Sequence, residues 1–333
     1  MIEVKNVSKN YGNFQAVTDV SFSVSAAEVL GFLGPNGAGK TTIMKMLTGY
    51  HFPSSGRVLI DGINAEEDPI AVKRRIGYLP ESVPLYGDMT VEEYLGFAAA
   101  ARFVPAAEAR GAVDKAIAAC ALGGAVRRQR IDSLSKGYKQ RLGLAQSIIH
   151  DPPILILDEP TSGLDPNQII EIRSLIRELG KSKTVILSTH ILQEVQAVCS
   201  RVLILNEGRI AAQGTPEEIA RSLKSPESEN AAETGDTWEL HLKGASPDLE
   251  NRLSRLGLDV TDVLAEKLET GIVRLCFTIK DSAAGNGIES GELIFNWAVN
   301  QGCKIISMNR KKPRLEDIFV KLTNEGKRNG RHA

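Results

Sequence analysis

The chain is 333 residues long with a mass of 36.1 kDa, a length that suggests two domains. Hydrophobic residues make up 42% and charged residues 24%, which is typical of a globular protein and excludes a fibrous or disordered one. Because 40 basic residues balance 41 acidic ones, the net charge of −1 argues against a protein that coats nucleic acid.

The cysteines and the hydropathy pattern bear on the cellular compartment. Four cysteines are widely spaced, without a CxxC pair, and this predicts neither a zinc site nor a disulfide framework; they are Cys120, Cys199, Cys276 and Cys303. No apolar stretch approaches the roughly 20 residues that span a bilayer. The polar N-terminus, MIEVKNVSKNYG, lacks the apolar core of a signal peptide. We therefore expect a cytoplasmic protein that meets a membrane only through a partner.

The first 221 residues are expected to form an α/β domain. Apolar and polar residues alternate in segments 2–4 and 20–24, which predicts half-exposed antiparallel strands. Three later segments are aliphatic at consecutive positions, which favours strands covered on both faces in a parallel sheet. They cover residues 29–33, 154–157 and 184–187. Between Val91 and His150 the pattern is helical and rich in alanine, which predicts a helical insertion.

A second, smaller domain is expected after a linker. Residues 222–237 carry almost no large apolar side chains and are interpreted as that linker. The segments beyond it indicate strands at 238–242, 273–279 and 304–308 and helices near 247–256 and 290–301. A β-α-β-β-α-β order, to which these segments contribute three strands and both helices, predicts a ferredoxin-like α+β domain over residues 238–324, followed by a basic tail at 325–333. A solvated tail and a contact with anionic lipid or nucleic acid are the two interpretations of that charge.

A phosphate-binding motif follows the strand at 29–33 and precedes a helical pattern at 41–47. The motif has the form GxxxxGK[ST], in which glycines let backbone N–H groups point at phosphate oxygens. Lys40 is expected to bridge the β- and γ-phosphates of ATP, and the Thr41 hydroxyl to bind Mg²⁺. A chance glycine-rich turn is the alternative. The residues expected to bind the nucleotide here are Gly34, Pro35, Asn36, Gly37, Ala38, Gly39, Lys40, Thr41 and Thr42.

Two acidic residues directly follow the buried strand at 154–157. Burying their negative charge there costs free energy unless a cation lies nearby. Asp158 is expected to hold Mg²⁺, through water. Glu159 is expected to orient or deprotonate the water that attacks the γ-phosphate. The alternative is that Glu159 only caps the following turn.

Four further segments resemble motifs of ABC ATPases and distinguish this P-loop from those of other families. Residues 134–141, LSKGYKQR, resemble the LSGGQ-type signature, and residues 162–166, SGLDP, resemble the D-loop. Residues 188–190, STH, resemble the switch histidine, and Tyr11 before Gly12 resembles the aromatic residue that stacks on adenine. The C-terminal part, including residues 314–319, is similar to the extension of ABC-2-type exporter ATPases, in the gliding-motility and drug-export branch.

The resemblance implies a P-loop NTPase of the ABC type, with an antiparallel β subdomain and a helical insertion, that works as a head-to-tail homodimer or paired ATPase. Ser135 and Gly137 of one subunit would touch the γ-phosphate bound by the other. His190 would hydrogen-bond the γ-phosphate and act in catalysis, and Asp165 of the D-loop would lie at the nucleotide. Read alone, Ser135 is an ordinary helix N-cap and His190 an ordinary capping or buried histidine.

This chain departs from the family pattern at three positions. Lys136 replaces the usual glycine of the signature and Tyr138 the usual glutamine. Glu81 stands at the position of the Q-loop glutamine, from which it could contact Mg²⁺ or the attacking water, or be an exposed loop acid. Catalysis is expected to survive these changes.

The function implied is that of the ATPase subunit of an ABC-type membrane transporter, an exporter, bound to ABC-2-type permease subunits at the cytoplasmic face of the membrane. ATP and Mg²⁺ are its expected cofactors, and nucleic acid is not an expected partner. The alternative is a soluble ABC ATPase that acts on the ribosome or on nucleic acid. Against it stand a single ATPase domain and the absence of a long heptad insertion.

Overall fold

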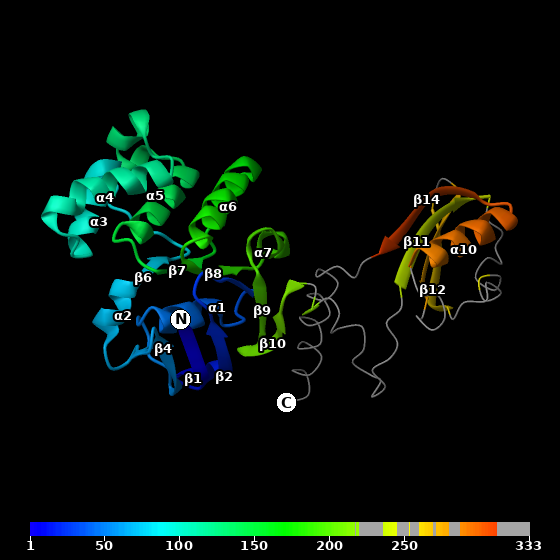
Figure 1. The fold of residues 1–333 in the computed structure, drawn as a ribbon, viewed down its shortest axis with the longest axis horizontal. Coiled ribbons are helices and arrows are strands. Elements are labelled where there is room, and N and C mark those ends of the chain that lie inside the picture. The colour runs from blue at the N-terminus through cyan, green and yellow to red at the C-terminus, as the bar shows by residue number, and fades with distance from the viewer. Residues whose placement is uncertain are drawn as a thin grey trace. The chain divides into compact units, whose positions relative to one another are not determined.

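The computed structural model describes residues 1–216, 218–219, 236–244, 253, 260–268, 271–279 and 287–311. The chain divides into two units: described residues up to Ile219 belong to the first, and those from Asp236 to Lys311 to the second. In Figure 1 the first unit is coloured blue to green, and the second yellow to red. None of the helices in these described ranges is long and apolar enough to cross a bilayer.

A six-stranded sheet forms the centre of the first unit, in the order β10-β9-β3-β8-β7-β6. Its strands are β3 (Val29–Leu33), β6 (Ile76–Leu79), β7 (Ile154–Asp158), β8 (Thr184–Thr189), β9 (Arg201–Asn206) and β10 (Arg209–Gly214). All pairs are parallel except the edge pair of β10 with β9. Every residue of β7 and β8 is buried, so the prediction of doubly covered parallel strands is confirmed.

A second, antiparallel sheet in the order β2-β1-β4-β5 confirms the half-exposed strands near the N-terminus. It consists of β1 (Ile2–Tyr11), β2 (Phe14–Val24), β4 (Ser55–Ile60) and β5 (Ile63–Asn64). Alternate residues of β2 are buried toward its C-terminal end, as the alternation of apolar and polar residues requires.

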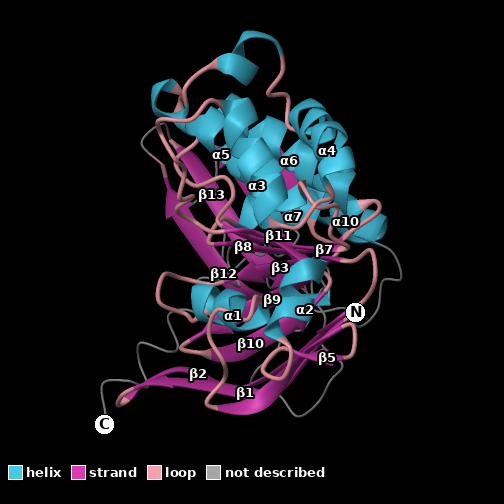
Figure 2. Ribbon diagram, turned by 90° about the vertical axis from the view of Figure 1, so that its left-hand side faces the viewer, coloured by secondary structure: helices cyan, strands magenta, loops and turns pink. Residues whose placement is uncertain are grey.

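The predicted helical insertion is present as α3 (Val91–Ala101), α4 (Ala106–Ala119), two 3₁₀ turns (Gly124–Arg128 and Ile131–Ser133) and α5 (Lys136–Ile148). A capping box of Thr90 and Glu93 fixes the start of α3. Arg127 pairs with Glu92 on α3 and with Asp114 on α4, which joins the first two helices. Figures 1 and 2 both show α3, α4 and α5 at the end of the unit away from β1 and β2.

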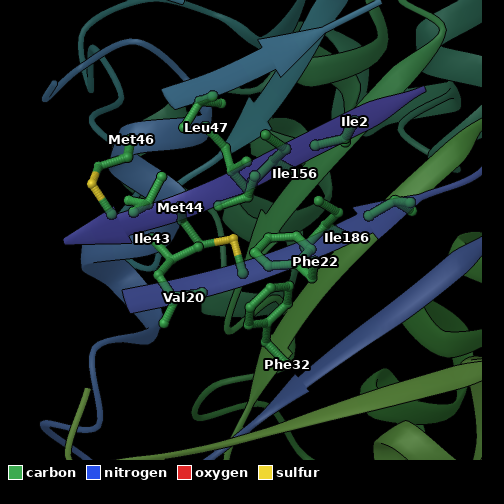
Figure 3. Close-up of a cluster of buried hydrophobic side chains, with 14 of the residues drawn as sticks. Ile2, Val20, Phe22, Phe32, Ile43, Met44, Met46, Leu47, Ile156 and Ile186 are labelled. Carbon is green, nitrogen blue, oxygen red and sulfur yellow. The ribbon is translucent and has the colours of Figure 1, made fainter. Parts of the chain in front are cut away.

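The sheets of the first unit are also flanked by α1 (Lys40–Leu47), α2 (Pro69–Arg75), α6 (Pro166–Gly180) and α7 (Leu192–Val198). Helix α1 packs between the two sheets, and its buried side chains join those of both sheets in one hydrophobic cluster (Figure 3). Ile43, Met44, Met46 and Leu47 of this helix are buried among side chains of both sheets. Phe22 of β2 meets Phe32 of β3 edge to face, with ring centroids 5.1 Å apart. This packing fixes the N-terminus of α1 at the end of β3.

The second unit is a four-stranded antiparallel sheet in the order β12-β13-β11-β14, covered by α10. Its elements are β11 (Asp236–Lys243), β12 (Val260–Lys267), β13 (Ile272–Ile279), α10 (Gly287–Asn300) and β14 (Lys304–Lys311). The order of the strands and the position of α10 in the chain fit the predicted ferredoxin-like domain, but β12 has no counterpart among the strands predicted from the sequence. Ile294 and Trp297 of α10 pack with Trp238, Leu240 and Phe277 of the sheet.

Several predictions fall on residues outside the described ranges. They are the linker, apart from Asp236 and Thr237, which already belong to β11; the helix at 247–256, apart from the buried Leu253; residues 314–319; and the tail at 325–333. The proposed domain limits at residues 221, 237 and 324 therefore stay predictions.

His150 lies between α5 and β7, and its lowered pKa leads us to expect a loss of stability in acid. Burial and the charges of Arg102 and Lys183 lower its pKa from 6.5 to about 4. Between these two pH values the unfolded chain binds a proton that the folded chain does not, so the free energy of unfolding falls as the pH drops from 6.5 to 4. We expect His150→Gln to lessen this fall by about 1 kcal/mol, because solvent screens part of the half-buried ring.

Urea unfolding of both proteins at pH 7 and pH 4.5 measures this difference. Far-UV circular dichroism is the appropriate signal, because both tryptophans, Trp238 and Trp297, lie in the second unit. An equal loss of stability in the variant and the wild type would show that His150 is not responsible.

Candidate nucleotide site

The loop between β3 and α1 is shaped by glycines at positions that accept no other residue easily. Gly39 has a φ of 103°, and a Cβ there would lie 2.8 Å from the carbonyl oxygen of Ala16. A Cβ on Gly34 would lie 2.6 Å from the carbonyl oxygen of Leu205. Gly39 is also the N-cap of α1 and provides no side-chain acceptor, so the first N–H groups of the helix stay available for an anion.

A cavity of about 470 Å³ opens in front of this loop. It is lined by Tyr11, Phe14, Ala16, Asn36, Gly37, Gly39, Lys40, Thr41, Thr42, Glu81, Glu159, Ser162 and His190. Residues from the hairpin of β1 and β2, from the loop, and from the ends of three parallel strands thus meet in one place. The carboxyl ends of parallel strands are where ligands bind in such sheets.

Lys40 is buried, with 6% of its surface exposed. Its Nζ donates to the carbonyl oxygens of Gly34 at 2.7 Å and Pro35 at 3.2 Å, and lies 3.6 Å from Oε1 of Glu159. Two neutral carbonyls and one carboxylate therefore hold the ammonium group beneath the loop. Phosphate oxygens in the cavity would offer this cation stronger, charge-assisted acceptors.

Asp158 ends β7 and is 1% exposed. Its Oδ1 accepts a hydrogen bond from the Ser188 hydroxyl, while its Oδ2 has no hydrogen-bond partner among the described residues. A buried carboxylate oxygen without a partner is costly, so it points to a ligand that is bound in the working protein.

Glu159 has left-handed backbone geometry, with a φ of 50°, which is uncommon for a residue other than glycine and is found preferentially at functional sites. Its backbone N–H donates to the Ser188 carbonyl oxygen at 3.1 Å. Its carboxyl Oε2 lies 2.9 Å from Nδ1 of His190. Burial raises its pKa above the ordinary value of 4.5, against the opposing positive charges of His190 and Lys40. A carboxyl group whose pKa is shifted toward neutrality, next to a phosphate pocket, suits a general base.

The structure does not bring every predicted residue to the cavity. Ser135 is the N-cap of α5 and accepts from the N–H of Tyr138 at 3.4 Å, and Asp165 is the N-cap of α6 and accepts from the N–H of Gln168 at 3.0 Å. Neither they nor Gly137 line the cavity within the described part of the chain. Gly34, Pro35 and Ala38 belong to the loop but do not line the cavity, and neither does Asp158, which directly precedes the lining residue Glu159.

Three lining residues have no counterpart in the predicted set: Phe14, Ala16 and Ser162. Phe14 is 65% exposed and pairs with Tyr11, which is 42% exposed, across the tight turn between β1 and β2. Two exposed aromatic side chains at one hairpin offer a surface on which a base can stack. A second aromatic residue three positions after Tyr11 was the available sequence signal for Phe14.

Comparisons with known proteins agree with this geometry. A family model described as ABC transporter matches residues 17–162. The uncharacterized ABC transporter ATP-binding protein YxlF of Bacillus subtilis (strain 168) is 32% identical over 322 residues, covering 97% of this chain and 99% of that protein. The Nod factor export ATP-binding protein I of Rhizobium meliloti is 30% identical over 331 residues, covering 97% and 88%.

Among solved structures, a dimeric bacterial ABC transporter cassette aligns with a TM-score of 0.60 and 25% identity, over 65% of this chain and 98% of the cassette. The matches to whole relatives extend beyond the ATP-binding cassette into the C-terminal part of the chain. The chain therefore belongs to the ABC transporter family, as a subunit that binds and hydrolyses ATP for a membrane transporter.

Proposed function

We propose that two copies of this subunit, or one copy and a paired ATPase, close on two ATP molecules and thereby drive a separate permease. One chain gathers Lys40, Glu159 and His190 around its cavity, whereas Ser135 and Gly137 lie outside it. Ser135 is exposed at the N-terminus of α5, where a helix presents its positive end. A second chain can bring that end to the γ-phosphate, and a similar cassette has a dimeric structure.

The observation that carries the proposal is the position of Glu159 between Lys40 and His190, at 3.6 Å and 2.9 Å. In the proposed reaction the loop amides and Lys40 hold the phosphates. Glu159 accepts a proton from the attacking water, and His190 hydrogen-bonds the γ-phosphate. Tyr11 supports the adenine.

The residues at the cavity fit Mg²⁺. The unpartnered Oδ2 of Asp158 and the side-chain oxygens of Thr41 and Glu81 are the hard oxygen donors that this ion prefers. The described residues hold no group of three or more His, Cys, Asp or Glu side chains that could bind a metal alone. That fits an ion that keeps waters and takes phosphate oxygens as ligands. When bound, Mg²⁺ neutralises phosphate charge.

We further propose an ABC-2-type exporter at the cytoplasmic face of the membrane, where the permease would hold this subunit. In support, a relative that matches nearly the whole chain is named for Nod factor export. The helices between residues 91 and 150 and the loop at Glu81, which reaches the cavity, would transmit closure to the permease.

A mixing experiment tests the shared site. Lys40→Ala removes the phosphate contact of one chain, and Ser135→Arg blocks the signature that it lends to its partner. Each variant alone should hydrolyse ATP at least about 10-fold more slowly than the wild type. An equal mixture should recover up to about a quarter of wild-type activity, because half of the dimers then hold one intact site.

Ser133→Ala, two residues before Ser135 in an exposed 3₁₀ turn, is the control and should hydrolyse ATP normally. If each site were completed within one chain, Ser135→Arg would be fully active by itself, and the mixture would only average the activities of its two components.

A further inference from the structure

A buried carboxyl group behind the nucleotide site has no part in the mechanism described so far. Glu194 on α7 is 1% exposed. Its Oε1 accepts a hydrogen bond from the Thr161 hydroxyl, and its Oε2 accepts one from the Thr189 hydroxyl at 2.6 Å. Nη2 of Arg173, on α6, lies 3.7 Å from Oε1 and supplies the opposite charge. A buried acid is tolerated where both oxygens accept hydrogen bonds and a cation lies beside it.

The two threonines belong to the two segments that carry the catalytic pair. Thr161 comes two residues after Glu159, and Thr189 comes directly before His190. The hydroxyl oxygen of Thr189 also accepts from the N–H of Ile191 at 3.0 Å. The turns on both sides of the Glu159–His190 contact are thus attached to the same carboxyl group.

The sheet fixes this contact only in part. The parallel pairing of β7 and β8 ends at Asp158 and Ser188, and the N–H of Glu159 makes one further backbone hydrogen bond, to the Ser188 carbonyl oxygen at 3.1 Å. Thr189 still pairs with Leu33 of β3, whereas His190 lies beyond the last pair of both ladders. Glu159 holds a left-handed backbone geometry there, which persists only where surrounding contacts enforce it. His190 is about half exposed, so packing constrains its ring little.

We propose that Glu194 is a positioning residue for hydrolysis: it holds the segments after β7 and β8 at the separation that keeps His190 against Glu159. This inference rests on the proposed roles of Glu159 and His190. The hydrogen bonds of Glu194 with the hydroxyl groups of Thr161 and Thr189 set the spacing of the two turns, and Arg173 keeps the carboxyl group in place. Loss of either hydroxyl lets the two turns drift apart while the phosphate-binding loop stays intact.

Substitutions of Thr189 test the proposal. Thr189→Val keeps the shape of the side chain and removes the hydroxyl, whereas Thr189→Ser keeps the hydroxyl. We expect valine to lower the single-turnover rate of ATP hydrolysis by about 10- to 100-fold, the cost of a small misplacement of catalytic groups, with ATP affinity unchanged. Serine should restore the rate to within about 3-fold of the wild type.

The matched control is Thr184→Val at the opposite end of the same strand. Thr184 is also buried, and its hydroxyl also makes two hydrogen bonds, accepting from Ala27 N–H at 3.0 Å and donating to the Ser25 carbonyl oxygen at 3.2 Å. This variant should hydrolyse ATP within about 2-fold of the wild type, even where it is less stable. Equal rate losses in Thr184→Val and Thr189→Val would reduce the role of Thr189 to general stability and overturn the proposal.

A His190→Ala background shows whether the network acts through the histidine. In that background, Thr189→Val should lower the rate of ATP hydrolysis less than about 2-fold, because the imidazole that the network positions is already absent. The proposal is contradicted if Thr189→Val lowers the rate of hydrolysis as much in that background as in the wild type. It is also contradicted if Thr189→Ser is as inactive as Thr189→Val. If Thr189→Val is fully active while Glu159→Gln is inactive, only this inference fails. If Glu159→Gln is itself active, the proposed function fails first.

Discussion

Glu159→Gln is expected to bind ATP as well as the wild type and to hydrolyse it at least about 100-fold more slowly, the scale of losing a positioned general base. The amide fills the same space near Lys40 and His190 but cannot accept the proton of the attacking water. Because closure depends on ATP and reopening on hydrolysis, the variant should also accumulate as a dimer in Mg-ATP. Phosphate release, calorimetry of ATP binding and size-exclusion chromatography measure the three effects.

Glu178→Gln is the control for this substitution. Glu178 lies exposed on α6, paired with Lys181, so its neutralisation should leave hydrolysis unchanged. The wild-type enzyme should also lose kcat/KM as the pH falls through the pKa of Glu159, which burial places above the ordinary 4.5. Wild-type phosphate release by purified Glu159→Gln would show that another group activates the water.

Much of this site could be predicted from the sequence, because its chemistry depends on residues that are close together in the chain. The loop at residues 34–41 requires glycines at set positions, and the structure shows why: a Cβ at Gly34 or Gly39 would strike a backbone carbonyl. Aliphatic runs that end in acids mark buried strands with polar ends, as β7 confirms. The residues Ser135 and Asp165 are N-caps here, which their types at the starts of helices also indicate.

Part of what the sequence did not reveal is local: Phe14 and Ser162 reach the cavity through turns only three residues from Tyr11 and Glu159. The rest depends on contacts between segments that are separated in the chain. The network of Glu194 joins α7 to residues of α6, β8 and the turn after β7, which no single spacing links. In the same way, Asp165 was expected at the nucleotide from its motif, but in one chain its side chain caps α6.

Lys40→Ala should weaken ATP binding by about 10- to 100-fold, the range for losing hydrogen bonds between charged groups, and hydrolysis should fall with it. The buried ammonium now donates to two loop carbonyls, and no other cationic side chain among the described residues that line the cavity can replace it, apart from a protonated His190. Its loss also leaves Glu159 with a single positive neighbour, which raises the pKa of that carboxyl group further.

Lys45→Ala on the same helix separates this effect from damage to α1. Lys45 lies in the last turn, with its ammonium 5.9 Å from the ring centroid of Tyr50, and does not line the cavity. It should bind ATP normally by calorimetry, whereas Lys40→Ala should need at least about 10-fold more nucleotide for half-saturation. Equal affinities in the two variants would mean that the loop amides alone hold the phosphates, so that Lys40 serves only to balance the charge of Glu159.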